Sequence, residues 1–148
     1  IFGAIWVWLE RRNANPSIPM KAGLGLMGLA AGFFVLAWGA ANATSDSLVS
    51  PSWLVVTYFL HTVGELCISP IGLSAITKLS PQRRVGQMMG IWFVGAALGN
   101  LFAGLVAGQL ETMAPSDLFR TVAMIIGAVG LGALALAPQI KKWAGGVR

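Results

Sequence analysis

Charged residues are scarce in this sequence. They make up 10% of its 148 residues, whereas an ordinary soluble domain has about 25%. Hydrophobic residues reach 56%, and the mean hydropathy is +0.75. This composition argues against a soluble globular domain and places the chain in the membrane class.

Cysteine and histidine are almost absent as well, with one of each, Cys67 and His61. A lone cysteine cannot close an internal disulfide, and one histidine with one cysteine cannot complete a metal site. No Ser-His-Asp arrangement with workable geometry and no phosphate-binding loop is present. The basic residues are dispersed over three connectors, which argues against a nucleic-acid surface. We therefore expect no enzyme, no metal centre, no cofactor and no nucleic-acid partner.

Long apolar runs are what the sequence does contain. A hydrocarbon core about 30 Å thick requires roughly 20 apolar residues in a helix. A backbone in lipid must satisfy its own hydrogen bonds, and these runs lack the alternation of a barrel strand. We predict an all-α membrane protein without a separate soluble domain, formed by the end of a preceding helix and by spans at about 22–41, 53–79, 86–110 and 118–138.

The connectors between these spans alternate in charge. The first and third connectors and the tail carry most of the basic residues, whereas the second and fourth carry acids. Basic loops favour the cytoplasmic side. The alternation predicts a multi-pass protein of the cell inner membrane with its tail in the cytoplasm; the residues concerned are Arg11, Arg12, Lys78, Arg83, Arg84, Lys141, Lys142 and Arg148, against Asp46, Glu111 and Asp117.

One acid, Glu65, lies in the middle of the second span. It is roughly 20 Å from either end of that span at 1.5 Å per residue, so it cannot reach water along the helix surface. A charge at this depth costs about 2.5–3.5 kcal/mol on insertion scales and usually marks a functional site. We expect Glu65 to face protein or a water-filled cavity and to exchange a proton there. The alternative is a buried acid that only pairs with a structural partner.

The residues around Glu65 fit a site. Residues four apart share a helix face, so His61, Glu65 and Ser69 are predicted to lie on one stripe that Gly72 continues. Pro70 removes one backbone hydrogen bond, a disruption that transporter helices tolerate beside a cavity. Glycines four residues apart predict close helix packing, at Gly28 and Gly32, Gly86 and Gly90, Gly95 and Gly99, and Gly104 and Gly108.

The stretch GELCISPIGLSAITKLSP, followed by GQMMGIWF, resembles the tenth and eleventh helices of the proton-dependent oligopeptide transporter family within the major facilitator superfamily. The four spans are similar to helices nine to twelve of that family, and the chain's start to the end of helix eight. The resemblance implies the C-terminal part of a twelve-helix bundle of two six-helix halves that rock around a midplane site.

The same resemblance implies proton-coupled uptake of di- and tripeptides by alternating access. Glu65 would face the peptide's amino group, and Trp92 would line the same cavity. Ser69 is a substrate-binding candidate by its position on the stripe. Short peptides, protons, the lipid bilayer and the missing N-terminal half of the same protein are the implied partners.

Two departures from the family pattern matter. Gly95, Ala96 and Ala97 stand where a small hydroxyl residue often lies near Trp92. His61 is not a feature of the family at this position, and we hypothesise that it tunes the proton affinity of Glu65; the alternative is a histidine on the helix surface. Two other functions remain open: a proton-driven major-facilitator carrier of another substrate, and a structural membrane helical bundle.

Overall fold

A computed structural model of the protein describes residues 11–12, 16–43 and 49–143. Four long helices dominate it, each long and apolar enough to cross a membrane by its length and composition. The predicted all-α fold class is confirmed, and no β-strand occurs in the described ranges. The elements are α2 (Ile18–Ala41), α3 (Ser52–Leu79), α4 (Val85–Gly108) and α5 (Pro115–Trp143), with the short 3-10 helices η1 (Gln82–Arg84) and η2 (Gln109–Glu111) at the two ends of α4. The predicted end of a preceding helix lies almost entirely outside the described residues.

The helix ends differ from the predicted ones where proline is involved. The first span was expected at 22–41, but α2 begins at Ile18, with Pro19 in its first turn. Proline is tolerated there because the first amides of a helix have no intrahelical partner. The last span was expected to end at Pro138, but α5 continues through this residue to Trp143. The predicted third span, 86–110, tightens into η2 after Gly108.

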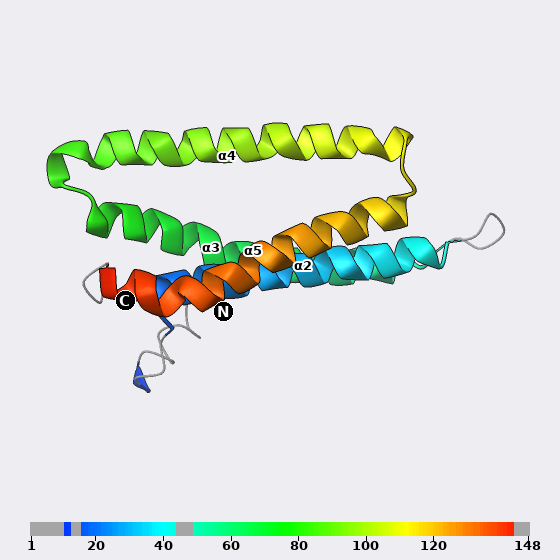
Figure 1. The fold of residues 1–148 in the computed structure, drawn as a ribbon, viewed down its shortest axis with the longest axis horizontal. Helices are drawn as coiled ribbons and strands as arrows, with labels where there is room; N and C mark the ends of the chain where they lie inside the picture. Colours follow the sequence, from blue (N-terminus) through cyan, green and yellow to red (C-terminus); the bar gives the residue numbers. More distant parts are fainter. Residues whose placement is uncertain (1–10, 13–15, 44–48, 144–148) are drawn as a thin grey trace.

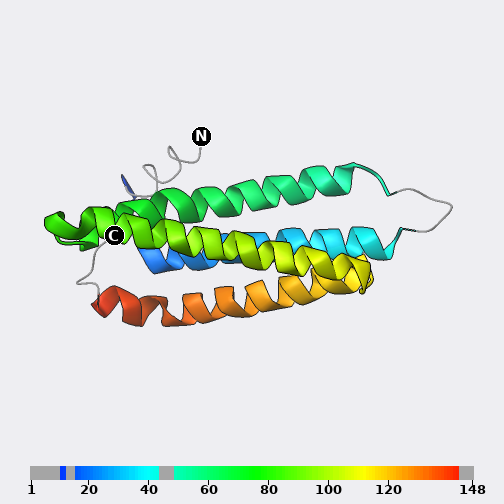
Figure 2. The same cartoon turned by 90° about the horizontal axis from the view of Figure 1, so that it is seen from above.

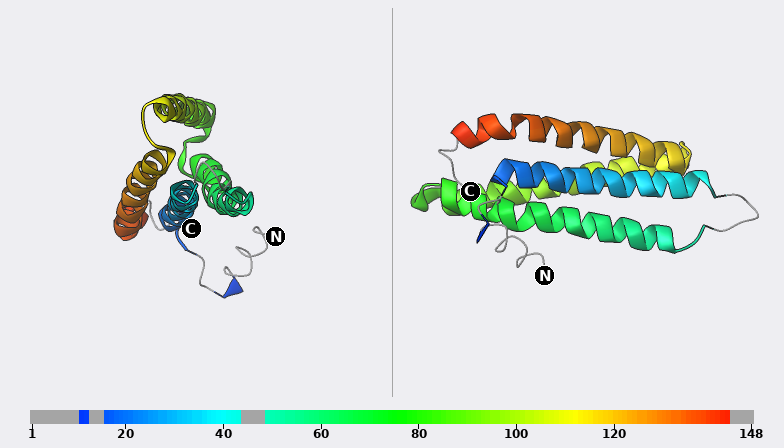
Figure 3. Two further views of the ribbon diagram at one scale, coloured as in Figure 1. Left: turned by 90° about the vertical axis from the view of Figure 1, so that its right-hand side faces the viewer. Right: turned by 90° about the horizontal axis from the view of Figure 1, so that it is seen from below.

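Three of the helices form a layer, and α4 stands to one side of it. α2 lies between α3 and α5 and packs against both (Figure 1). Figure 2 shows α4 crossing in front of this layer, and the end-on view in Figure 3 shows the separation. No residue of α4 is buried within the described chain. The core is therefore built around α2.

The contact between α2 and α3 brings two backbones together. A β-carbon added at Gly64 would lie 2.7 Å from the carbonyl oxygen of Gly25, and one added at Gly25 would lie 2.8 Å from the carbonyl oxygen of Gly64. No side chain of any size fits between these atoms. Farther along the same interface, the buried Thr57 hydroxyl donates a hydrogen bond to the Gly32 carbonyl at 3.3 Å.

The contact between α2 and α5 is also made by small residues. A β-carbon added at Gly130 would lie 3.2 Å from the Leu26 side chain, and one at Gly127 would lie 3.7 Å from Ala30. Ala30 and Ala123 are almost completely buried, with 2% and 0% of their surface exposed. Membrane helices usually pack closely through small residues, because lipid provides no hydrophobic driving force for their association.

The predicted glycine pairs have two different environments. Gly28 and Gly32 lie in the interface between α2 and α3. The α4 pairs have no atom within 4 Å of their added β-carbons in the described part of the chain; they are Gly86, Gly90, Gly95, Gly99, Gly104 and Gly108. Glycine spacing alone therefore did not identify which helix would be packed.

We expect Gly64→Ala to lower the free energy of unfolding by about 1–3 kcal/mol, the usual penalty for overpacking, because the new methyl group would overlap the Gly25 backbone. Reversible unfolding of the full-length protein in mixed micelles would measure this. Gly28→Ala is the matched control, because its β-carbon would have its nearest neighbours at an ordinary 3.5 Å. Equal stability of the two variants would contradict the close backbone contact.

Candidate functional site

Glu65 occupies the middle of α3. It lies thirteen positions after Ser52 and fourteen before Leu79, which places it roughly 20 Å from either end. Its side chain is exposed in the described chain. Because contact with lipid at this depth is costly for a carboxylate, this exposed position requires either water or further protein beside it.

The rotation of α3 is set by its contact with α2. Gly64 and Ile68 contact Gly25, and His61 contacts Gly32. Together with Thr57, these residues form the face that α3 presents to α2. Residue 65 is turned about 100° from residue 64 in an α-helix, which brings Glu65 out of the contact and onto the adjoining face.

The adjoining face of α3 carries Glu65, Ser69 and Gly72, which follow a spacing of four and three residues. Such residues lie above one another on one side of a helix. Glu65 and Ser69 are exposed, and Gly72 is partly exposed. The structure therefore places the predicted acid and hydroxyl on a common surface.

Trp92 of α4 reaches across to this surface. A β-carbon added at Gly72 would overlap the indole ring, with Cζ3 of Trp92 at 2.7 Å. The missing side chain at Gly72 therefore creates the space that the indole occupies. Gly72 lies roughly 10 Å along the helix axis from Glu65 and about 4.5 Å from Ser69, at 1.5 Å per residue. The predicted site residues thus come from two helices: Glu65 and Ser69 lie on one face of α3, and Trp92 of α4 contacts the same face at Gly72.

His61 points in a different direction from the prediction. Its ring contacts Gly32 and lies against Phe33 of α2, with ring centroids 4.7 Å apart. Its Nε2 is buried and has no hydrogen-bond partner in the described part of the chain. The His61 side chain is therefore part of the packing between α2 and α3, whereas Glu65 is exposed on the adjoining face of α3.

Pro70 does not break α3, which continues as a helix from Ser52 to Leu79. Because proline has no amide hydrogen, the Leu66 carbonyl loses its usual partner one turn earlier. This carbonyl follows Glu65 directly in the sequence.

Two other features were not found from the sequence. Lys21, which follows the first basic connector in the sequence, lies inside α2, and only 7% of its surface is exposed. A cavity of about 360 Å³ also opens between the end of α2 and the start of α5. Its lining includes Asp117 and Arg120, a charged pair three residues apart that the sequence does display at the start of the fourth span.

Metal binding finds no support among the described residues, where no three His, Cys, Asp or Glu side chains form a group that could hold an ion. Glu65 is the one acid inside the four helices that lies away from a helix end in these ranges. Its exposed carboxylate is a group that can pair with a cation.

Comparison with known proteins identifies a family that this chain matches. A sequence profile described as the POT family matches residues 1–127. The peptide transporter YePEPT of Yersinia enterocolitica is 41% identical over 138 residues, which cover 88% of this chain and 27% of that protein. Dipeptide and tripeptide permease A of Chromobacterium violaceum is 35% identical over 138 residues, which cover 84% of this chain and 28% of the permease.

A solved structure is similar as well. The crystal structure of a mutant of the peptide transporter POT in complex with alafosfalin matches with a TM-score of 0.81 and 36% identity, over 95% of this chain and 28% of that chain. This chain thus spans between a quarter and a third of the length of the relatives that it matches.

We expect Gly72→Ala to displace the Trp92 indole, since the new methyl group and the ring cannot share the same space. In a full-length protein whose other tryptophans are replaced by phenylalanine, acrylamide quenching and the emission maximum of Trp92 would both change. Gly90→Ala is the control, because it adds a methyl group near Trp92 on α4 without a neighbour within 4 Å in the described chain. An unchanged Trp92 emission in Gly72→Ala would refute the contact.

Proposed function

This chain belongs to the POT family, and from that membership we propose that it supplies part of the C-terminal half of a carrier that takes up di- and tripeptides together with protons. The observation that carries the proposal is the exposed Glu65 at mid-span, on the α3 face that Trp92 overhangs. The printed names of two relatives, a peptide transporter and a dipeptide and tripeptide permease, support the substrate class.

Glu65 is proposed to bind the amino group of the peptide and to take part in proton coupling. An apolar surrounding favours the protonated form of a carboxylate, whereas a nearby cation favours the ionised form. A peptide ammonium group or a basic residue of the N-terminal half would be that cation. Alternation between the two surroundings would load and release a proton during each transport cycle.

Trp92 and Ser69 are proposed to complete this wall of the cavity. The indole offers a rigid apolar surface for a peptide side chain. Its contact with Gly72 fixes its position along the axis of α3 relative to Glu65. The exposed Ser69 hydroxyl lies one turn from Glu65 and can exchange hydrogen bonds with the peptide backbone. The small residues at Gly95, Ala96 and Ala97 offer no such group.

The proposed cycle uses the arrangement of the helices. The charged turn η1 joins α3 and α4, and its Arg83 and Arg84 are exposed. This end would form part of the cytoplasmic gate, since basic connectors favour that side. We propose the inner membrane as the location, with the tail in the cytoplasm and the N-terminal half of the same protein as the other wall of the cavity. The proposed role is transport, without catalysis or a cofactor.

We expect Glu65→Gln to lower proton-driven dipeptide uptake about tenfold or more, because a hydrogen bond to a charged group contributes about 1.5–3 kcal/mol. Uptake by the full-length protein in liposomes with an imposed proton gradient would measure this. Glu111→Gln is the matched control, since it makes the same change in the exposed turn η2.

The outcomes of this experiment separate the three functions. Intact uptake in Glu65→Gln would favour a structural role for the acid. Failure of dipeptides to compete for uptake would favour a carrier of another substrate. Loss of uptake in Glu65→Gln, with normal activity in Glu111→Gln, is the result that the proposal requires.

We also propose that His61 tunes proton exchange at Glu65, and expect His61→Gln to change the pH dependence of uptake. Because His61 packs on α2 through Gly32 and Phe33, a change in packing must be separated from a change in charge. Phe33→Leu removes the ring contact and keeps the imidazole. The hypothesis fails if His61→Gln leaves the pH profile unchanged, or if Phe33→Leu changes it equally.

A further inference from the structure

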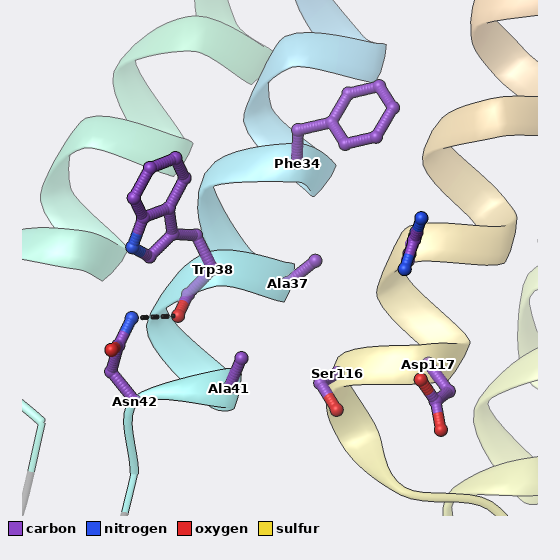
Figure 4. Close-up of a pocket in the computed structure, with 8 residues that line it drawn as sticks. Phe34, Ala37, Trp38, Ala41, Asn42, Ser116 and Asp117 are labelled. Carbon is purple, nitrogen blue, oxygen red and sulfur yellow. Dashed lines mark hydrogen bonds between the residues drawn. The ribbon is translucent and has the colours of Figure 1, made fainter.

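A cavity with both charged and aromatic walls lies where α2 ends and α5 begins. Its volume is about 360 Å³. Figure 4 shows Ser116 and Asp117 of α5 across from the end of α2 and from Asn42, the residue that follows it. The lining residues come from α2, α5 and the residue after α2; they are Phe34, Ala37, Trp38, Ala41, Asn42, Ser116, Asp117 and Arg120.

The charges of this cavity are Asp117 and Arg120, which stand three residues apart on α5. Residues at this spacing are neighbours on the helix surface. Both side chains are exposed, and within the described residues no ion pair joins them. The Asn42 amide already donates to the Trp38 carbonyl at 2.8 Å (Figure 4). The lining therefore presents one carboxylate and one guanidinium from the same helix.

A second cavity lies deeper along the same pair of helices. It has a volume of about 390 Å³ and shares Phe34 with the first. Its walls carry no charged side chain; they are Met27, Ala30, Ala31, Phe34, Ala123, Met124, Gly127, Ala128 and Leu131. Neither α3 nor α4 contributes a lining residue to either cavity.

Together the two cavities form a groove with a polar end and an apolar remainder, which we call the α2–α5 groove. From Trp38 to Met27 it extends for eleven residues of α2, or about 16 Å at 1.5 Å per residue. Half of a hydrocarbon core about 30 Å thick is about 15 Å. The groove thus extends from the end of the helices to about the middle of the membrane.

We propose that the α2–α5 groove binds one zwitterionic aminophospholipid of the phosphatidylethanolamine class. Arg120 holds the phosphate diester, and Asp117 accepts hydrogen bonds from the primary ammonium group. One acyl chain lies in the apolar part, over the small side chains of Ala31 and Ala128 and the backbone of Gly127.

Charge complementarity selects this occupant. A guanidinium beside a carboxylate matches a headgroup that carries a phosphate and an ammonium in one molecule. A phosphatidylglycerol headgroup would satisfy Arg120 and leave Asp117 facing another negative charge. A phosphatidylcholine headgroup has no N–H to donate to Asp117. The groove as a whole has about the length of the hydrocarbon layer of one leaflet, which is where an acyl chain resides.

Native mass spectrometry of the full-length protein can test this, with phosphatidylethanolamine, phosphatidylglycerol and phosphatidylcholine added in turn. We expect phosphatidylethanolamine to be retained most tightly. Arg120→Gln should weaken its binding about tenfold, the effect of losing one hydrogen bond to a charged group. Asp117→Asn should remove the preference for phosphatidylethanolamine over phosphatidylglycerol. Arg83→Gln, in the distant turn η1, is the charge-matched control and should have no effect.

A steric variant tests the apolar part independently. Ala128→Phe leaves both charges in place and fills the groove, so it should lower the binding of all three lipids. The proposal is overturned if wild-type protein retains the three lipids equally, if Arg120→Gln and Asp117→Asn bind as the wild type does, or if another helix of the full-length protein occupies the groove and excludes lipid. None of these results depends on peptide uptake, so this site and the transport function can fail separately.

Discussion

The mutual contact of two glycines, Gly25 and Gly64, is the constraint on which the rest of the arrangement depends. Lipid gives apolar side chains no reason to prefer one another, so these helices associate through close backbone packing. The contact fixes which side of α3 meets α2, and it does so one residue before Glu65. A larger residue at either glycine would push the helices apart and alter the direction in which the acid points. The packing of the layer and the presentation of the acid therefore have one common origin.

Much of this could be predicted from the sequence, because hydropathy and length are local properties. The four membrane helices and the depth of Glu65 follow from them directly. The helix ends were less predictable: Pro19 and Pro138 suggest boundaries, yet proline is compatible with a first turn and, at the cost of one hydrogen bond, with a helix near its end. The family resemblance rested on a short stretch of α3 and α4, and the comparisons confirm it.

The parts that could not be predicted depend on partners that are distant in sequence. A spacing of four residues placed His61 and Glu65 on one stripe, but periodicity does not show where a neighbouring helix lies. The stripe is divided by α2, which covers His61 and leaves Glu65 exposed. Glycine spacing was equally uninformative, since the same pattern is packed in α2 and lacks neighbours within the described part of α4. The contact of Trp92 with Gly72 could not be predicted either, because it depends on the paths of both α3 and α4.

The position of α4 has a mechanical consequence. It is anchored by a tight turn at each end, has no buried residue in the described chain, and meets α3 where an indole rests on a glycine. Because α4 makes few contacts with the three-helix layer, a rotation of α4 about its long axis would leave the packing of that layer unchanged. A roll of a few degrees would swing the tip of the indole across the surface next to the acid. The width of the space beside the carboxylate therefore depends on the rotation of α4.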